Sequence, residues 1–418
     1  MEQSFYISYF LDTRRAKKSG KFPLKLRAFT SSPRKQKLYP TVFEFTEKEF
    51  ESIWLTTKPR TEYKEVRRQM QAVENKAVDS AKELSPFTFE QFEKKLFRKD
   101  GDGTNIFYQY EATIKYLKAQ GQIGTASTYE LSLKSIKEYL TILNTKEQST
   151  LSFIEVTPKW LNGYEKFMTG APKNKSLTTV SMYLRALRAI FNKAIEEKEI
   201  DSEIYPFGKR KYQMPAVRSV KKSLSKEQLK TLFDAVPLTP EQRKAKDFWF
   251  FSYSCNGMNI KDVALIKHKD VQEGKIVYYR AKTINTGKAD LKPITVYLSD
   301  FGKRIIAEYG NKKNASDDFV FSIANENQSL LERHRAIKNF TKFINQNLKK
   351  LAKHNGITNE ISTYWARHSF ATNAIRSGAS MEFVSEALNH SNLKVTQGYF
   401  SGFEDEAKKD FMENLMKF

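Results

Sequence analysis

A histidine and a tyrosine stand nine residues apart in the stretch LNHSNLKVTQGYF, residues 388–400, as His390 and Tyr399. Upstream, the stretch TYWARHSFAT, residues 363–372, carries Arg367. Cleaving a phosphodiester without a metal ion requires a nucleophile, cations that neutralise the phosphate oxygens and an acid for the leaving oxygen. Because the chain has 20 tyrosines, a tyrosine that only fills a core is the alternative.

A tyrosine nucleophile suits DNA breakage that has to be reversed. The phosphotyrosyl bond conserves the energy of the broken ester, so religation needs no ATP. Such a site also needs neighbouring groups that hold the reacting parts in place.

The composition favours a polyanionic partner. The formal net charge is +23 and the pI is about 9.6. The positive excess lies mainly in the first hundred residues and after residue 200. Nucleic acid, as double-stranded DNA, is the first candidate, and a generally basic surface without a partner is the alternative.

The single cysteine, Cys255, excludes a disulfide or a cysteine-based zinc site within the chain. The first residues, MEQSFYISYFLDTRRAKK, lack the layout of a signal peptide, and no apolar run approaches membrane-spanning length. We therefore expect an intracellular, cytoplasmic protein that does not enter a membrane.

The elements that must position the candidate residues fall into three regions, of which the first is residues 1–104. Its alternating stretches SFYISYFLD, FPLKLRAFT and KLYPTVFEFT predict three strands, and TEYKEVRRQMQAVENKAVDSAKEL predicts a polar helix. Strands can contact a DNA groove, although an ordinary solvated sheet face is the alternative. The basic residues of this predicted sheet are Arg14, Arg15, Lys17, Lys18, Lys25 and Arg27.

The second region, residues 105–207, shows apolar spacing of three to four throughout and predicts a helix bundle with Thr125 or Ser127 and Ser176 as N-caps. After it, GKRKYQMPAVRSVKKS, residues 208–223, predicts an extended basic linker. The linker could lie along DNA phosphates, or it could be a solvated charge run. Its candidate DNA-binding residues are Lys209, Arg210, Lys211, Lys221 and Lys222.

The third region, residues 224–418, mixes helices with a hairpin. SKEQLKTLFDAV predicts a helix with a capping box from Ser225 to Gln228. KIVYYRAKT and KPITVYL predict two strands around the turn INTGKAD. The final stretch, FEDEAKKDFMENLMKF, predicts a helix with one apolar stripe. The stripe consists of Ala407, Phe411, Leu415 and Phe418.

Taken together, these residues resemble the tyrosine recombinase (phage integrase) family. ARHSFAT matches the box of the family's second catalytic arginine, and YYRAKT matches the hairpin of its catalytic lysine. SYSCNGMNIKDVALIKHKDV is similar to the box that normally reads Gly-Leu-Arg-Ile-Ser-Glu-Leu. The resemblance covers the whole chain and is strongest over residues 250–400. The family signature Leu-Gly-His-Ser, then Thr, then Tyr corresponds to Leu388, Asn389, His390, Ser391, Thr396 and Tyr399.

The resemblance implies a multidomain, mainly α-helical fold. It places a small β-sheet arm-binding domain at 1–104, a helical, SAM-like core-binding domain at 105–207, and the linker at 208–223. A mixed α/β catalytic domain with a C-terminal tail then covers 224–418. This layout looks like that of integrases from conjugative and mobilizable transposons. The tail is expected to dock on a neighbouring protomer, with packing in cis as the alternative.

The resemblance also implies catalytic roles. Tyr399 would attack the scissile phosphate and form a 3′-phosphotyrosyl link. Arg367 would bind the non-bridging oxygens, and His390 would donate a hydrogen bond to the phosphate. Lys282 would protonate the leaving 5′ oxygen, and Asp262 would buttress the site.

Two positions depart from the family's pattern. Asn259 stands where the first arginine is expected, and Tyr364 stands where a histidine usually begins the box of Arg367. Asn259 can donate hydrogen bonds without charge, and Tyr364 can donate one to a phosphate oxygen but is no cation near pH 7. We expect His368 to pack against or support the site, with direct catalysis as the alternative.

Arg280 is the predicted replacement for the missing arginine. It stands two residues before Lys282, and residues i and i+2 of a strand share a face. Contact with flanking DNA backbone is the alternative role for Arg280. Lys261 is a rival, but on a helix it would point away from Asn259.

We therefore expect a site-specific recombinase that integrates and excises a mobile element through a Holliday junction, without a metal or nucleotide cofactor. Four protomers, monomeric when free, would act on two DNA duplexes with core and arm sites. A host DNA-bending factor or an excision factor would assist them. The alternatives are a non-cleaving DNA-binding accessory protein derived from an integrase, favoured by Asn259 and Tyr364, and a type IB topoisomerase.

Overall fold

The structure is a computed structural model of the chain. It divides into two compact units, Met1–Gln109 with Gln148–Thr157 and Ile190–Tyr205, and Tyr110–Glu147 with Pro158–Ala189 and Pro206–Phe418. No helix among the described residues is long and apolar enough to cross a membrane. The described residues are 5–17, 19–84, 86–97, 101–144, 148–216, 222–282, 284, 292–313, 315–358, 360–390, 392–400, 402, 408–409, 412–413 and 415.

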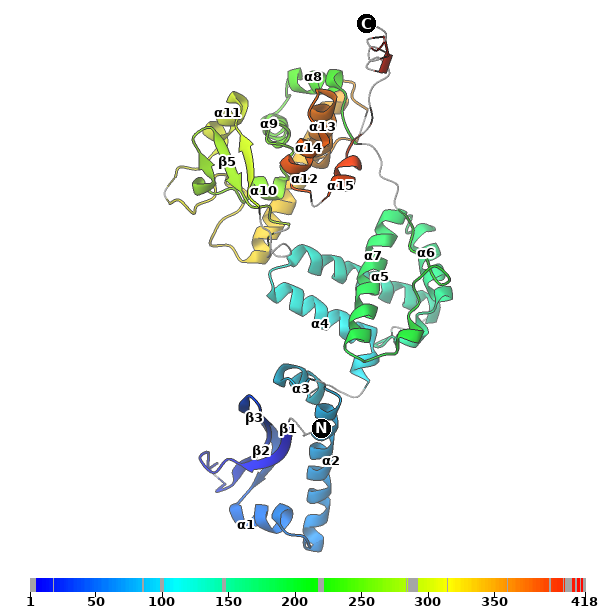
Figure 1. Ribbon diagram of the computed structural model, residues 1–418, viewed down its shortest axis with the longest axis vertical. Helices are drawn as coiled ribbons and strands as arrows, with labels where there is room; N and C mark the ends of the chain where they lie inside the picture. The colour runs from blue at the N-terminus through cyan, green and yellow to red at the C-terminus, as the bar shows by residue number, and fades with distance from the viewer. Residues whose placement is uncertain are drawn as a thin grey trace. The chain divides into compact units, whose positions relative to one another are not determined.

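The N-terminal region folds as the predicted three-stranded sheet (Figure 1). Its strands β1 (Phe5–Leu11), β2 (Phe22–Ser31) and β3 (Arg34–Phe45) are antiparallel in the order β1-β2-β3. Alternation along β2 buries Leu24 and Leu26 and directs Lys25 to the other face. The sequence pattern therefore decides which face of the sheet meets the core.

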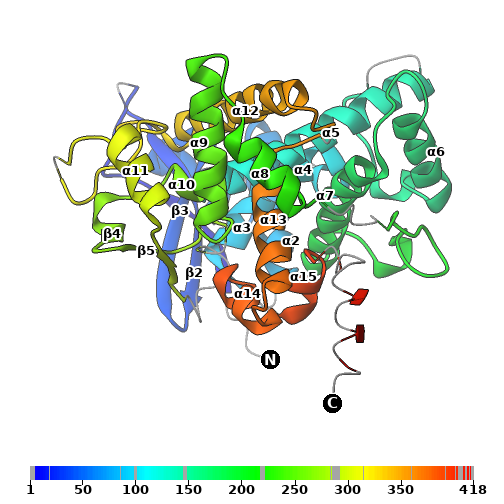
Figure 2. The same ribbon diagram turned by 90° about the horizontal axis from the view of Figure 1, so that it is seen from above.

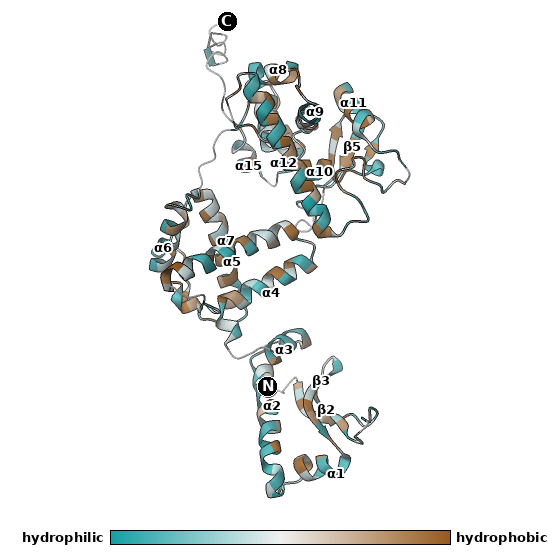
Figure 3. Ribbon diagram, turned by 180° about the vertical axis from the view of Figure 1, so that it is seen from behind, coloured by the Kyte–Doolittle hydropathy of each residue, from teal (hydrophilic) through white to brown (hydrophobic). Residues whose placement is uncertain are grey.

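Helices pack on the apolar face of this sheet. After α1 (Glu47–Phe50) and a π-helical turn come α2 (Lys64–Lys82) and α3 (Phe89–Leu96). α2 is mostly hydrophilic with isolated hydrophobic residues, as Figure 3 shows, and its Met70 is fully buried. The hydroxyl of Tyr9 on β1 donates to the Met70 carbonyl at 2.8 Å, which ties α2 to the sheet.

Four helices form the second region, and they are α4 (Ile106–Ala119), α5 (Ile123–Asn144), α6 (Pro158–Thr169) and α7 (Leu177–Glu196). Ser132 on α5 makes a hydrogen bond with the Tyr110 hydroxyl at 2.8 Å and donates to the Tyr183 carbonyl at 3.0 Å. One buried hydroxyl thus joins three helices.

Of the two helix caps predicted in this region, one is present in the structure and one is not. Ser176 accepts a hydrogen bond from the Thr179 amide at 3.3 Å and caps α7, as predicted. The predicted cap at Thr125 or Ser127 is wrong, because α5 already begins at Ile123 and both residues lie inside the helix.

The start of the predicted linker is folded rather than extended. Phe207 and Tyr212 are buried and pair with each other, and the Gly208 amide donates to the Tyr212 carbonyl at 3.0 Å. The Tyr212 hydroxyl donates to Glu165 on α6. Burial of two aromatic rings thus overrides the local charge pattern. The turn leaves Lys209, Arg210 and Lys211 exposed, while Lys221 lies outside the described residues.

The third region is built around α9 (Pro240–Ser254), whose Phe248, Trp249 and Phe251 are fully buried. α12 (Leu330–His354) and α13 (Thr363–Arg376) pack against it, and Figure 2 shows these helices together. α8 (Lys226–Asp234) begins with the predicted capping box from Ser225 to Gln228.

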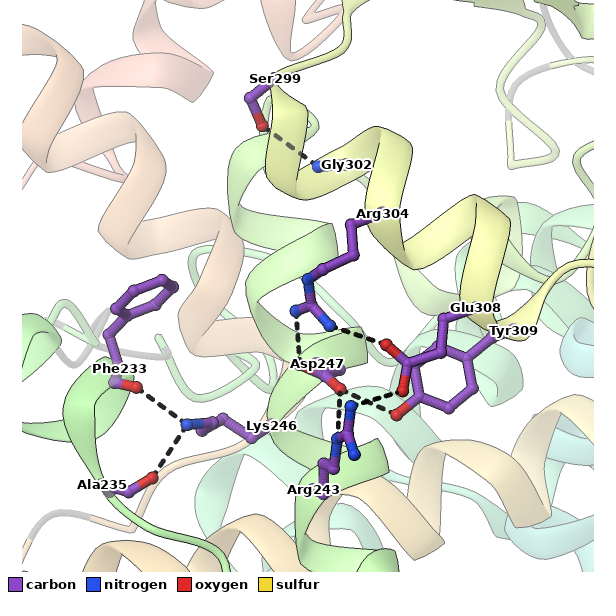
Figure 4. Close-up of polar contacts among 10 residues, drawn as sticks. All are labelled: Phe233, Ala235, Arg243, Lys246, Asp247, Ser299, Gly302, Arg304, Glu308 and Tyr309. Carbon is purple, nitrogen blue, oxygen red and sulfur yellow. Dashed lines mark hydrogen bonds and ion pairs between the residues drawn. The ribbon is translucent and has the colours of Figure 1, made fainter.

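A small sheet and α11 complete this core. The strands β4 (Val271–Gln272), β5 (Lys275–Tyr278) and β6 (Ile294–Tyr297) are antiparallel, with β5 in the middle. α11 (Asp300–Tyr309) is held to α9 through buried Asp247, as Figure 4 shows. Asp247 accepts hydrogen bonds from Arg304 at 3.1 Å and from the Tyr309 hydroxyl at 2.8 Å.

Short helices carry the remaining candidate residues. α10 (Ile260–Val263) follows α9, while α14 (Met381–Ala387) and α15 (Leu393–Gln397) lie near the end of α13 in Figures 1 and 2. In the predicted C-terminal stripe, Leu415 is exposed, and Ala407, Phe411 and Phe418 lie outside the described residues.

Candidate active site

The C-terminal helices bring four predicted residues around Tyr399. Tyr364, Arg367 and His368 stand three and four residues apart on α13 and therefore share one face of it. His390 follows α14, and Tyr399 follows α15. The Tyr399 ring centroid lies 4.3 Å from that of His368 and 5.0 Å from that of His390.

Arg367 is a buried cation held by backbone carbonyls. Its side chain donates to the Gly257 carbonyl at 3.1 Å and to the Leu388 carbonyl at 2.6 Å. Burial, and then the charge of Arg280, lower the pKa of Arg367, but a guanidinium stays protonated. No ion pair between described residues includes Arg367. A buried charge without a carboxylate partner favours an anionic ligand, such as a phosphate, at this place.

Gly257 is a site residue to which the sequence assigned no role. It has φ +63°, and a Cβ there would lie 2.7 Å from the Arg367 Cα. Only glycine combines this backbone conformation with this close approach. The glycine before Met258, in the box that is similar to the family's Gly-Leu-Arg box, was the available signal, but the sequence did not show what it packs against.

His390 is oriented by two neighbours. Its Nδ1 lies 2.9 Å from the Thr396 hydroxyl, and its Nε2 lies 3.4 Å from Nη2 of Arg367. Because arginine can only donate, Nε2 accepts and the proton lies on Nδ1. Burial, followed by the charges of Arg367, Arg280 and Lys282, lowers the pKa of His390 to about 4. His390 is therefore neutral at pH 7 in the DNA-free protein.

His368 packs between two aromatic rings. It stacks on Tyr399 with an interplanar angle of 24° and meets Tyr364 edge-on at 4.6 Å. Burial is the main cause that lowers the pKa of His368 to about 4. These contacts agree with the expected packing role.

Arg280 reaches the site by a route that differs from the predicted one. β5 ends at Tyr278, so Arg280 and Lys282 do not share a strand face. The chain after the strand instead brings Nη1 of Arg280 to 3.5 Å from the Leu388 carbonyl, the group that Arg367 also binds. Lys282 is exposed. Two guanidinium groups thus converge on one carbonyl.

Asp262 fixes the backbone segment between Arg280 and Lys282. It is buried, and its Oδ1 accepts a hydrogen bond from the Ala281 amide at 2.9 Å. Burial is the main cause that raises the pKa of Asp262. Asp262 therefore holds the backbone between Arg280 and Lys282, which is the geometry expected of a buttress.

The position of the missing arginine lies at the start of α10. Asn259 is the N-cap residue of that helix and makes no side-chain capping hydrogen bond. Lys261 is exposed and lies near His334 on α12, where burial and then the charge of Lys261 lower the pKa of His334.

Tyr364 contacts the candidate nucleophile directly. Its hydroxyl donates to the Tyr399 hydroxyl at 3.1 Å. Thr372, also on α13, donates to the Tyr399 backbone carbonyl at 3.2 Å. The sequence motif contained both residues, but it showed neither contact.

The basic residues of the N-terminal sheet are partly committed to the fold. Lys25 and Arg14 bind buried Asp12 at 2.7 and 2.9 Å, and they are the main cause that lowers the pKa of Asp12 to about 2. Arg27 donates to Ser8 at 3.1 Å. Lys17 pairs with Glu44, Arg15 is exposed, and Lys18 lies outside the described residues.

A resident metal ion has no evident ligand set in the described part of the chain. There, no group of three or more histidine, cysteine, aspartate or glutamate side chains comes together as ligands. The polar groups around Tyr399 are cations, phenols and neutral imidazoles, which suit an anionic ligand.

Comparison with known proteins matches the chain to two integrase domain families and to tyrosine recombinases. Residues 105–214 match the phage integrase SAM-like domain, and residues 222–405 match the phage integrase family. Tyrosine recombinase XerC of Listeria welshimeri is 23% identical over 296 residues, which cover 70% of this chain and 91% of that protein. Tyrosine recombinase XerA of Thermococcus kodakarensis is 27% identical over 238 residues, covering 56% and 74%.

A solved structure also shares the fold. The XerH site-specific recombinase, bound to a palindromic difH substrate in a post-cleavage complex, aligns with a TM-score of 0.50 at 19% identity. The alignment covers 82% of this chain and 92% of that one.

Proposed function

Because the chain belongs to the tyrosine recombinase family of the integrase type, whose members cleave and religate DNA strands, we propose that it integrates and excises a mobile DNA element through a 3′-phosphotyrosyl intermediate. The observation that carries this proposal is buried Arg367, which forms no ion pair among the described residues and lies beside Tyr399, with 5.8 Å between the guanidinium carbon and the ring centroid. A phosphate would supply the missing negative charge.

The proposed cleavage step begins at the partly buried Tyr399. Its Oη forms a bond to phosphorus while the bond from phosphorus to the 5′ oxygen breaks. The phenolic proton leaves to solvent, and Lys282 gives a proton to the 5′ oxygen. Religation runs the same exchange in reverse.

Arg367 and Arg280 would neutralise the charge that develops on the phosphate oxygens. Their convergence on the Leu388 carbonyl brings two guanidinium groups close to one another, which supports a shared role in binding phosphate. We propose that Arg280 thereby replaces the arginine absent at Asn259.

His390 can serve this reaction by changing its tautomer. In the DNA-free protein its Nε2 is an acceptor toward Arg367. Because the Thr396 hydroxyl can donate as well as accept, His390 can shift its proton to Nε2 and then donate to a phosphate oxygen. Thr396 would thus permit both tautomers.

The proposed organisation follows from the three regions. Residues 1–104 would bind arm sites, residues 105–207 and 224–418 would enclose the core site, and the basic segment 208–223 would contact the backbone between them. Four protomers, monomeric when free, would join two duplexes and form a Holliday junction, aided by a host DNA-bending or excision factor.

Deleting 1–104 should abolish integration and leave covalent complex formation on a core site measurable. Full recombination by the truncated protein would contradict this tethering role.

The test of the proposed function is covalent trapping on a nicked duplex that carries the element's own end. The wild-type protein should form an adduct that peptide mapping assigns to Tyr399. Tyr399→Phe should form none while its DNA affinity stays nearly intact, because affinity arises from many phosphate contacts. No adduct from the wild-type protein would favour the non-cleaving accessory protein instead.

A further inference from the structure

The two tyrosine hydroxyls of the site form one hydrogen-bonded pair. Tyr364 comes from the first turn of α13, and Tyr399 follows α15, 35 residues later. Their ring centroids are 6.1 Å apart at an interplanar angle of 56°, so the rings do not stack. The hydroxyl-to-hydroxyl distance of 3.1 Å is therefore the contact that joins them.

The ring of Tyr364 is held from two directions. His368, one helical turn further on, meets it edge-on at 4.6 Å. Nζ of Lys222, from the segment before α8, lies 5.8 Å from its ring centroid. Although Tyr364 is 44% exposed, these contacts fix the direction of its hydroxyl.

The hydroxyl of Tyr364 keeps its proton near neutral pH. Burial, and then the hydrogen bond and charge of Tyr399, raise the pKa of Tyr364 well above its ordinary value. A phenol that stays protonated can donate to a neighbouring oxygen throughout a reaction. This assignment agrees with the geometry, in which Tyr364 donates and Tyr399 accepts.

We propose that Tyr364 is a positioning residue for the nucleophile. Its hydroxyl aims Oη of Tyr399 and stabilises the negative charge that builds on this oxygen as the phenolic proton leaves. Only Tyr399 forms a bond to phosphorus, and Tyr364 keeps its own proton throughout. This inference rests on the proposed function, because it takes Tyr399 as the attacking group.

The role depends on the phenol itself. The hydroxyl is the group of Tyr364 that contacts Tyr399 Oη, at 3.1 Å.

The experiment compares the full-length protein with Tyr364→Phe, which keeps the ring and its packing and removes only the hydroxyl. The rate constant of covalent complex formation is measured at saturating nicked DNA between pH 6 and pH 10. We expect it to be about tenfold lower in Tyr364→Phe near neutral pH, the loss of one hydrogen bond to a charged atom. The deficit should shrink as pH rises, because the nucleophile then loses its proton without help.

Both proteins keep the other titratable and charged groups near the pair, so the difference between their pH profiles isolates one hydroxyl. These groups are Lys222, Arg280, Lys282, Arg367, His368 and His390.

Tyr309→Phe is the matched control. It removes a tyrosine hydroxyl that donates to Asp247 between α9 and α11, and its cleavage rate should equal that of the wild-type protein. Thermal unfolding of all variants shows whether each one folds. An unchanged or faster rate in Tyr364→Phe would overturn the inference, and so would a deficit of the same size at every pH, which indicates a purely structural role. An adduct that maps to a residue other than Tyr399 would instead overturn the proposed function.

Discussion

Two charged side chains, Asp12 in the N-terminal sheet region and Arg367 on α13, are almost completely buried, with exposed fractions of 0% and 3%. The Asp12 carboxylate forms ion pairs with Lys25 at 2.7 Å and with Arg14 at 2.9 Å. Arg367 donates to the carbonyls of Gly257 and Leu388 and lies near the ring nitrogen of His390, and no described carboxylate forms an ion pair with it. The first charge forms two ion pairs inside the fold, whereas the second forms none among the described residues and feels buried Asp262 only at longer range.

This difference separates a structural charge from a functional one. A buried ion that is paired and hydrogen-bonded contributes to the fold, and the pKa of Asp12 near 2 reports that stabilisation. A buried cation without a counter-charge costs stability until an anion arrives. The catalytic region therefore keeps a buried guanidinium that has no ion-pair partner among the described residues and that a DNA phosphate can bind.

The largest expected effect comes from removing the charge of Arg367. Arg367→Gln should lower the rate of covalent complex formation by about 10²–10³, because one aimed donor to the phosphate is lost. Single-turnover trapping on nicked DNA measures this rate. Lys261→Gln removes an exposed cation from the nearby α10 and should change the rate little. A loss of less than about tenfold in Arg367→Gln would show that Arg367 is not the main phosphate ligand.

The second effect tests whether Arg280 completes the pair of cations. Arg280→Ala should reduce the cleavage rate at saturating DNA by about 10², whereas Asn259→Ala should reduce it much less. The same nicked substrate serves for both variants. A salt-sensitive binding defect with normal cleavage at saturation would place Arg280 on the flanking backbone instead.

The two regions should also lose stability in different pH windows. Unfolded histidine takes up a proton below about pH 6.5, whereas folded His368 and His390 do so only near pH 4. The unfolded state binds more protons between these values, so the catalytic region loses stability as pH falls through them. Asp12 stays ionised down to about pH 2 in the fold, so the N-terminal sheet should lose its stabilisation from about pH 4 downward.

Hydrogen exchange of the full chain at stepped pH would resolve these windows region by region. Asp12→Asn should lower the protection of the N-terminal sheet near neutral pH and remove its acid step. The catalytic region should keep its own window in this variant. Loss of protection in both regions over one common window would contradict the contrast between them.

The smallest effect concerns the cation above Tyr364. Lys222→Gln removes a contact between an ammonium group and an aromatic ring, which should lower the cleavage rate at saturating DNA by about threefold. A defect in DNA affinity alone would assign Lys222 to the phosphate backbone. Lys209→Gln, in the exposed turn beside Phe207, should affect affinity and not the rate.

Features that depend on local spacing were accessible from the sequence. Alternation in FPLKLRAFT predicts a strand, and the structure confirms it as β2, in which Leu24 and Leu26 are buried. Tyr364, Arg367 and His368 share one face of α13, which follows from their spacing once the segment is helical. These features follow from the periods of strands and helices, which neighbouring residues decide.

Contacts between distant segments were decided only by the tertiary structure. Arg367 meets Gly257, 110 residues away, and Arg280 meets Leu388, 108 residues away. No periodicity encodes such distances, because the packing of α9, α13 and the short helices determines them together. The same cause explains the folded turn at Tyr212. The sequence by itself therefore determined which residues could perform the chemistry, and tertiary packing decided which of them meet, since close approach depends on all elements being in place at once.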